Sequence, residues 1–112
     1  MTRNKEIMIN LLKKLLNAGP GFNMEELLSK GPLIIDVRTE KEFRSAHVQG
    51  SINIPLDKLL QSISRLDKTK PTITCCASGM RSATAANMLK HHGFTDVHNG
   101  GSWVSVQRKF KQ

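Results

Sequence analysis

The residues whose types and spacing suggest chemistry lie in residues 71–87, PTITCCASGMRSATAAN. The apolar run at residues 73–76 has the β-branched content of a short buried strand, and residues 81–89 show the apolar spacing of a helix. The turn between them sets the thiol of Cys76 at the end of a strand and follows it with small residues, whose backbone N–H groups can converge on one point. This arrangement predicts an anion cradle at the N-terminus of a helix.

The same turn predicts that Cys76 is a nucleophile. The following helix adds roughly half a positive charge at its N-terminus and Arg81 adds a full one, so we expect the thiol pKa to fall below the ~8.5 of a free cysteine. Gly79 suits the positive φ that such a loop needs, and the hydroxyls of Ser78 and Ser82 can hydrogen-bond to sulfur or to an oxyanion. The candidate site is therefore catalytic Cys76 with a substrate-binding loop of Ala77, Ser78, Gly79, Met80, Arg81 and Ser82.

The alternative is that Cys75 and Cys76 only pack in a core, as free cysteines often do. Core packing does not explain the glycine, arginine and serine that follow at these offsets. Adjacent cysteines form strained disulfides that close almost no loop, and neither they nor His91 and His92 have the spacing of zinc ligands. We therefore expect reduced thiols, no metal and no cofactor, in a reducing compartment such as the cytoplasm.

The length and charge of the chain limit its class. With 112 residues, the chain has room for one domain and one core. The 17 basic and nine acidic residues give a net charge of +8. The basic residues are scattered, without interleaved aromatic side chains, so a surface that attracts small anions is favoured and no nucleic-acid partner is expected.

Residues 1–21 predict an amphipathic helix followed by a linker, and residues 22–112 the domain itself. Apolar residues recur at helical spacing through residues 5–16, with polar ones between them. The segment has neither the form of a secretory signal nor the length to span a bilayer. Packing of its apolar stripe on the domain is favoured, and contact of residues 5–16 with a membrane or a partner is the alternative.

Strand and helix patterns alternate through the rest of the chain, which predicts a doubly wound parallel sheet with helices on both faces. Expected strands lie at residues 33–37, 51–54, 73–76 and 97–99. Expected helices lie at residues 24–29, 39–45 with Thr39 as the cap, 56–66, 81–89 and 102–110. Asn99-Gly100-Gly101 is predicted to form a flexible turn. Trp103 is expected to pack in the core.

Two polar side chains near the end of the first strand are further candidates. Asp36 is expected to brace the neighbouring loop through Arg38, because a carboxylate beside the sulfur would raise the thiol pKa. Arg38 is also a secondary candidate for attracting substrate. His47 is expected to tie its loop to backbone carbonyls and not to act as a general base.

Taken together, these motifs resemble the rhodanese family of sulfurtransferases. The resemblance rests on CASGMRS at residues 76–82 and on marks that stand in order along residues 22–110: Asp36-Val37-Arg38, Glu42-Phe43, His47 through Pro55, Gly93-Phe94, and Asn99-Gly100-Gly101 before Trp103. It implies that Cys76 takes sulfur from thiosulfate or a related donor as a persulfide. A small thiol, a thioredoxin-like protein or cyanide would then accept that sulfur.

The loop from Cys76 to Arg81 is six residues long, which suits one sulfur atom held ~2 Å beyond the thiol better than a tetrahedral phosphate. A small arsenate reductase or phosphatase of the same fold is therefore the weaker alternative, and a sulfur-carrier or partner-binding module is another. The sequence leaves open the physiological donor and acceptor, the oligomeric state and the role of Cys75.

Overall fold

The computed structural model describes residues 22–110, which form a parallel sheet with helices on both faces. The four strands are β1 (Leu33–Asp36), β2 (Ile52–Asn53), β3 (Thr72–Cys76) and β4 (Val97–Ser102), in the spatial order β2-β1-β3-β4. The helices are α2 (Met24–Ser29), α3 (Glu40–Ser45), α4 (Leu56–Ser62), α5 (Met80–His91) and α6 (Trp103–Phe110), and a 3-10 turn, η1 (Ile63–Arg65), follows α4. The predicted fold class is confirmed.

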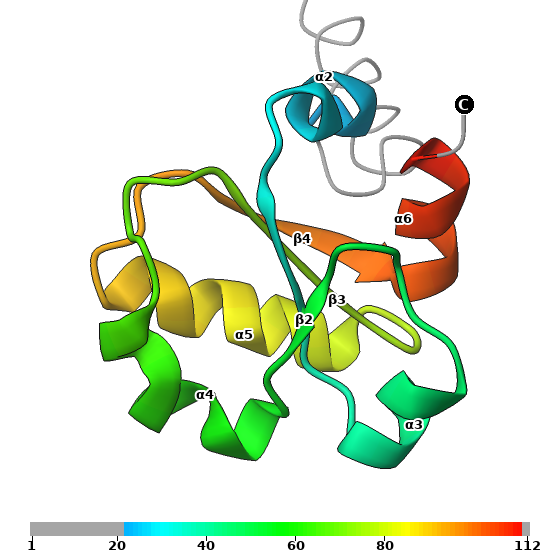
Figure 1. The fold of residues 1–112 in the computed structure, drawn as a ribbon. Helices are drawn as coiled ribbons and strands as arrows, with labels where there is room; N and C mark the ends of the chain where they lie inside the picture. Colours follow the sequence, from blue (N-terminus) through cyan, green and yellow to red (C-terminus); the bar gives the residue numbers. More distant parts are fainter. Residues whose placement is uncertain (1–21, 111–112) are drawn as a thin grey trace, which may run out of the picture.

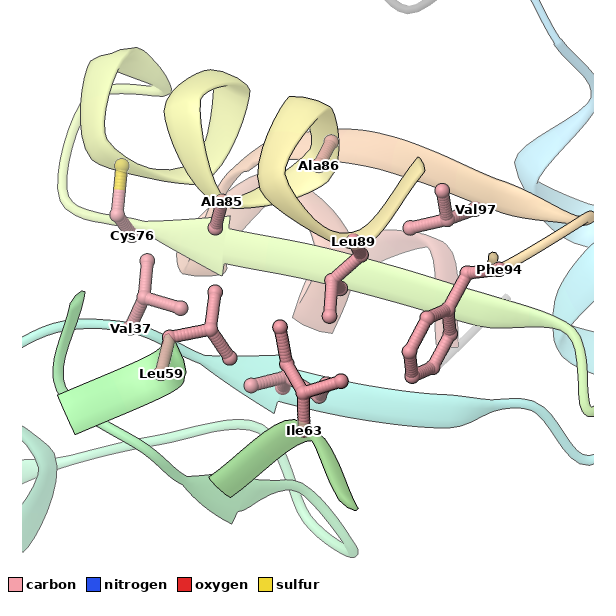
Figure 2. Packing of buried hydrophobic residues seen from close by; sticks show 10 residues of the cluster. Val37, Leu59, Ile63, Cys76, Ala85, Ala86, Leu89, Phe94 and Val97 are labelled. Atoms are coloured by element: carbon pink, nitrogen blue, oxygen red, sulfur yellow. The ribbon is translucent and has the colours of Figure 1, made fainter. Parts of the chain in front are cut away.

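The sheet separates two apolar cores. On one face, residues of α4 and α5 such as Leu59 and Leu89 pack over β1 and β3, as Figure 2 shows. On the other face, α2 and α6 contribute Leu27 and Val106 to a second cluster. Figure 1 shows α4 and α5 on one side of the sheet and α2 and α6 on the other. The central strand β3 is buried along its whole length, which agrees with its near-continuous apolar and β-branched sequence.

The elements that lead into the site begin where the sequence predicts them. Asn23 caps α2 by accepting a hydrogen bond from the N–H of Glu26. Thr39 caps α3, and its capping box with Glu42 is complete because each side chain accepts from the other residue's backbone N–H. This box fixes α3 at the carboxyl end of the sheet, the end at which the loop after β3 also lies (Figure 1).

The last strand differs from the prediction. Asn99, Gly100 and Gly101 do not form a flexible turn but continue β4 as far as Ser102. A Cβ atom on Gly100 would lie 2.6 Å from Cγ2 of Ile73, so the glycine serves close packing of β4 on β3 rather than chain reversal.

Other differences are smaller. The helix predicted at residues 56–66 ends at Ser62 and passes into η1, and its Leu60 side chain is 58% exposed. The amphipathic helix predicted within residues 1–21 lies outside the described residues. Within residues 22–110, no helix combines the length and apolar character needed to cross a membrane.

Candidate active site

The loop that joins β3 to α5 encloses the thiol of Cys76. Cys76 is the last residue of β3, and Met80 begins α5 after only three intervening residues. The chain turns this sharply because Gly79, the N-cap of α5, has a φ of 103°, in the left-handed region that glycine adopts without strain. In Figure 2 the sulfur lies beneath the first turn of α5.

Backbone and hydroxyl groups surround the sulfur. The N–H of Gly79 donates to Sγ at 2.9 Å, and the N–H of Ser82 donates at 3.4 Å. The hydroxyl of Ser82 lies 3.3 Å from Sγ. The two N–H groups point at one atom, one from the N-cap and one from the first turn of α5, which makes this segment a cradle for a negatively charged sulfur.

The surroundings of Cys76 act on its pKa in opposite directions. Burial is the largest single influence and raises the pKa, because it removes water from the thiolate. The hydrogen bonds from the Ser82 side chain and from the backbone N–H groups of Ser82, Gly79 and Ser78 favour the thiolate. Together they outweigh burial, so the net pKa lies below its ordinary value of 9.0.

Arg81 lies beside the cradle, but its charge is already engaged. Its guanidinium makes a two-pronged contact with the carboxylate of Glu42, at 2.8 Å to Oε1 and 3.1 Å to Oε2. The bonds to Arg81 and to the Thr39 cap lower the pKa of Glu42 to about 2. The ion pair therefore links the active-site loop to α3, and Arg81 holds the loop through a partner that the sequence interpretation did not assign to it.

Arg38, the secondary candidate, is buried away from the cradle donors. Its guanidinium binds Asp36, with Nη2 2.7 Å from Oδ2, and also donates to the carbonyl of Ala46 at 2.7 Å. The side chain is 5% exposed and its guanidinium carbon lies 5.0 Å from the ring centre of Trp103. These contacts match the bracing role expected for Asp36 and leave Arg38 occupied.

Cys75 faces the opposite side of the sheet from Cys76. It belongs to the cluster formed with α2 and α6, whereas Cys76 belongs to the cluster under α5. Burial raises the pKa of Cys75 to about 12, so its thiol stays protonated at neutral pH. Of these two thiols, only that of Cys76 has surroundings that favour the thiolate.

The structure also places the remaining residues that the sequence singled out. Ala77, Ser78 and Met80 are exposed at the mouth of the loop, and Met80 is 79% exposed. His47 stacks on Phe43 and its Nδ1 lies 2.7 Å from the Phe43 carbonyl, as the loop-anchoring interpretation predicts. Trp103 is partly buried against the α2 and α6 cluster. Within residues 22–110, no three His, Cys, Asp or Glu side chains gather as metal ligands would.

Two residues of the site were missed as site residues. The sequence marks Glu42 only as part of the family resemblance, but its carboxylate binds Arg81. Asn99 was placed in a turn, yet its side chain accepts from the Ser82 hydroxyl at 2.6 Å and donates to the Gly79 carbonyl at 3.3 Å. Both contacts join positions far apart in the sequence, and no local pattern marks them.

Comparison with known proteins gives a consistent result. A family model described as "Rhodanese-like domain" matches residues 23–109. Thiosulfate sulfurtransferase PspE of Escherichia coli is 38% identical over 74 residues, which are 64% of this chain and 71% of PspE. Thiosulfate sulfurtransferase GlpE of Pseudomonas savastanoi is 30% identical over 80 residues, 71% of this chain and 76% of GlpE.

A third relative and a solved structure extend the comparison. YqhL of Bacillus subtilis is 38% identical over 66 residues, which are 59% of this chain and 52% of YqhL, so the match spans about half of that protein. The solved structure described as "rhodanese with anions from E. coli" is 34% identical with a TM-score of 0.63, covering 66% of this chain and 89% of its own.

Proposed function

The chain belongs to the rhodanese-like domain family as an enzyme of the sulfurtransferase type, and we propose that it moves sulfane sulfur from thiosulfate through a persulfide on Cys76. The observation that supports this most directly is the cradle, in which the Gly79 N–H lies 2.9 Å from Sγ and Ser82 supplies two further contacts. A thiolate formed there is both stabilised and held in place.

The first half-reaction conserves charge without a proton. The Cys76 thiolate attacks the outer sulfur of thiosulfate, a new S–S bond forms, and the old S–S bond breaks with its electron pair leaving on sulfite. The product is a Cys76 persulfide whose outer sulfur carries one negative charge. The loop N–H groups from Ala77 to Ser82 are the donors proposed to hold that sulfur.

The second half-reaction restores the thiolate. An acceptor attacks the outer sulfur, and the S–S bond to Cys76 breaks with its electrons returning to Sγ. Cyanide serves in the test tube, and we propose a small thiol or a thioredoxin-like protein as acceptor in the cell. The reduced pair of cysteines agrees with a reducing compartment, and we propose the cytoplasm.

The exposed side chains of the loop next to the sulfur are uncharged. Cys76 itself is buried, whereas Ala77, Ser78 and Met80 are exposed. Long-range attraction of an anionic donor therefore depends on the surrounding basic surface.

The alternatives are less well supported. A phosphatase or arsenate reductase of this fold is not favoured, because PspE and GlpE are both named as thiosulfate sulfurtransferases and because the loop holds only six residues from Cys76 to Arg81. A non-catalytic carrier or partner-binding module does not require donors aimed at a sulfur whose pKa they lower.

The decisive experiment is the intact mass of the protein after incubation with thiosulfate. We expect a gain of one sulfur atom that disappears on addition of cyanide. The Cys76→Ser variant should show no gain, and the Cys75→Ser variant should behave as the parent protein. No gain in the parent protein, or a gain that requires Cys75, would overturn the proposal.

A further inference from the structure

We propose that Asn99 is a positioning residue for the nucleophile, which holds the hydroxyl hydrogen of Ser82 while the Cys76 sulfur is uncharged and releases it to the sulfur when a thiolate forms. The inference deepens the proposed function and rests on Cys76 as its nucleophile. It concerns the same site, but it assigns a task to a residue of β4 that is outside the loop.

The Ser82 hydroxyl lies among three polar atoms. It is 2.6 Å from Oδ1 of Asn99, 3.3 Å from Sγ of Cys76 and 3.5 Å from the carbonyl oxygen of Gly101, and Ser82 is 0% exposed. A hydroxyl carries one hydrogen and so satisfies one strong acceptor at a time. A neutral thiol can donate to the Ser82 oxygen while Ser82 donates to Asn99, whereas a thiolate needs that hydrogen for itself.

Asn99 is built to give up the hydrogen at little cost. Its Oδ1 also accepts from the Gly101 N–H at 2.9 Å, so it stays paired when the Ser82 hydroxyl turns away. Its amide nitrogen donates to the Gly79 carbonyl at 3.3 Å, and its backbone is in register with Thr74 of β3. The Asn99 side chain is therefore held by two further hydrogen bonds on a backbone fixed in the sheet, and we expect the Ser82 hydroxyl to be the group that moves.

The proposed cycle changes the charge on Sγ twice. Sγ is negative before it attacks thiosulfate, uncharged once it is the inner sulfur of the persulfide, and negative again when the acceptor removes the outer sulfur. If the Ser82 hydroxyl donates to Sγ only while Sγ is negatively charged, it stabilises the leaving thiolate in the second half-reaction. A permanently directed hydroxyl would instead stabilise the thiolate at rest and slow its attack.

The other groups around Cys76 do not supply this response. The ionisable neighbours are Arg81 on α5, which is paired with Glu42, and Cys75 on β3, with the Asp36–Arg38 pair at the end of β1. On β4, Ser102 is in register with Cys76, and Asn99 and Gly101 contact Ser82; none of the three is ionisable. Leu59 of α4 and Val37, which follows β1, are apolar neighbours in the same cluster (Figure 2).

The test is a double-mutant cycle on the ionisation of Cys76, followed by ultraviolet absorbance of the thiolate as pH is varied. Removing the competing acceptor in Asn99→Ala should raise the ratio of thiolate to thiol at fixed pH by up to about tenfold. In the Ser82→Ala background the same change should alter the ratio of thiolate to thiol less than about twofold, because the hydroxyl through which Asn99 acts on Cys76 is absent. An equal change in both backgrounds, or none in either, would overturn the proposal.

Two further variants complete the test, one as a control and one as a second substitution of Asn99. Asn53→Ala is the matched control, since the Asn53 amide donates to the carbonyls of Asp36 and Arg38 on the opposite edge of the sheet; it should leave the ratio unchanged. If Asn99→Ala does not fold, Asn99→Asp replaces it in the test, because its carboxylate still offers oxygen acceptors to Ser82 and to the Gly101 N–H. Because a carboxylate is a stronger acceptor than an amide, Asn99→Asp should lower the ratio of thiolate to thiol, and should lower it more when Ser82 is present than in the Ser82→Ala background. An equal effect in the two backgrounds would overturn the proposal. The titration needs no sulfur donor, so it can succeed where transfer from thiosulfate fails.

Discussion

Cys75 and Cys76 are neighbours in β3, yet their thiols have opposite chemistry. Successive side chains of a strand point to opposite faces of the sheet, so Cys75 enters an apolar core while Cys76 meets the N–H groups that precede α5. Burial without donors raises the pKa of Cys75 to about 12, whereas donors outweigh burial at Cys76. The position at the strand end therefore decides which of the two thiols has surroundings that favour its ionisation.

This difference predicts the pH dependence of persulfide formation. The pKa of Cys76 lies below its ordinary value of 9.0, so the rate with thiosulfate should rise with pH to a plateau, with a midpoint below 9.0. It should fall as pH drops through the lowered pKa, because protonation removes the nucleophile. Single-turnover rates measured by mass would show this, and Cys75→Ser should give the same midpoint. A midpoint at or above 9.0 would contradict the cradle argument.

At the scale of elements, the Arg81–Glu42 ion pair joins α5 to α3. Glu42 serves two elements at once, as the third helical residue of α3 in the capping box and as the partner of the loop arginine. Both side chains are about one-third exposed, at 36% and 35%. The pair is therefore expected to add less than about 1 kcal/mol to stability, and its importance lies in geometry.

This contact predicts how substitutions at Arg81 behave. If Arg81 acts by fixing the loop through its two-pronged contact, Arg81→Lys should lose nearly as much kcat/KM as Arg81→Ala, about 10- to 100-fold, because lysine cannot reproduce that geometry. Glu42→Gln keeps the capping box of α3 and should show a smaller loss. Steady-state kinetics with thiosulfate and cyanide would decide. Near-normal activity in Arg81→Lys would mean that charge alone is the contribution of Arg81.

The close packing of β4 on β3 at Gly100 predicts that a larger residue at this position destabilises the domain. In Gly100→Ala, the new Cβ would lie 2.6 Å from Cγ2 of Ile73 and 2.9 Å from the Thr74 carbonyl oxygen. We expect a loss of about 1–3 kcal/mol in the free energy of unfolding. Activity should also fall, because Asn99 and Gly101 flank the displaced residue.

Gly31→Ala is the matched control for that experiment. Gly31 has a φ of 63° but open space around a Cβ, so it should cost about 1 kcal/mol through backbone strain alone and leave activity intact. Urea unfolding and sulfur transfer, measured on both variants, separate the two effects. Equal losses of activity in the two variants would show that β4 packing does not support the site.

The sequence predicts those features of the site that depend on residues close together in the chain, and misses those that depend on distant ones. The strand end, the positive φ of Gly79 and the start of α5 are encoded within a few residues of Cys76, and the sequence predicted them. Asn-Gly-Gly is locally a turn signal, but contact with Ile73 holds it in β4, and such tertiary packing overrides local preference. The partners of Arg81 and Ser82 are 39 and 17 positions away, so they emerge only when the strands are placed side by side.

At the scale of the whole molecule, the net charge of +8 should bring an anionic donor toward a loop mouth that has no free charge of its own. Long-range attraction of this kind is screened by salt, with a Debye length of about 10 Å at 0.1 M. We predict that kcat/KM for thiosulfate falls several-fold as ionic strength rises. The rate of alkylation of Cys76 by neutral iodoacetamide should change far less than that by anionic iodoacetate.

Deletion of residues 1–21 sharpens this prediction and tests the proposed division at residue 22. That segment carries four basic residues and one acidic residue, so its removal lowers the net positive charge. We expect residues 22–112 to fold, to form the persulfide, and to show a shallower dependence of kcat/KM on salt. An unchanged salt dependence would place the attraction in charges close to the loop, and loss of folding would show that the segment belongs to the domain.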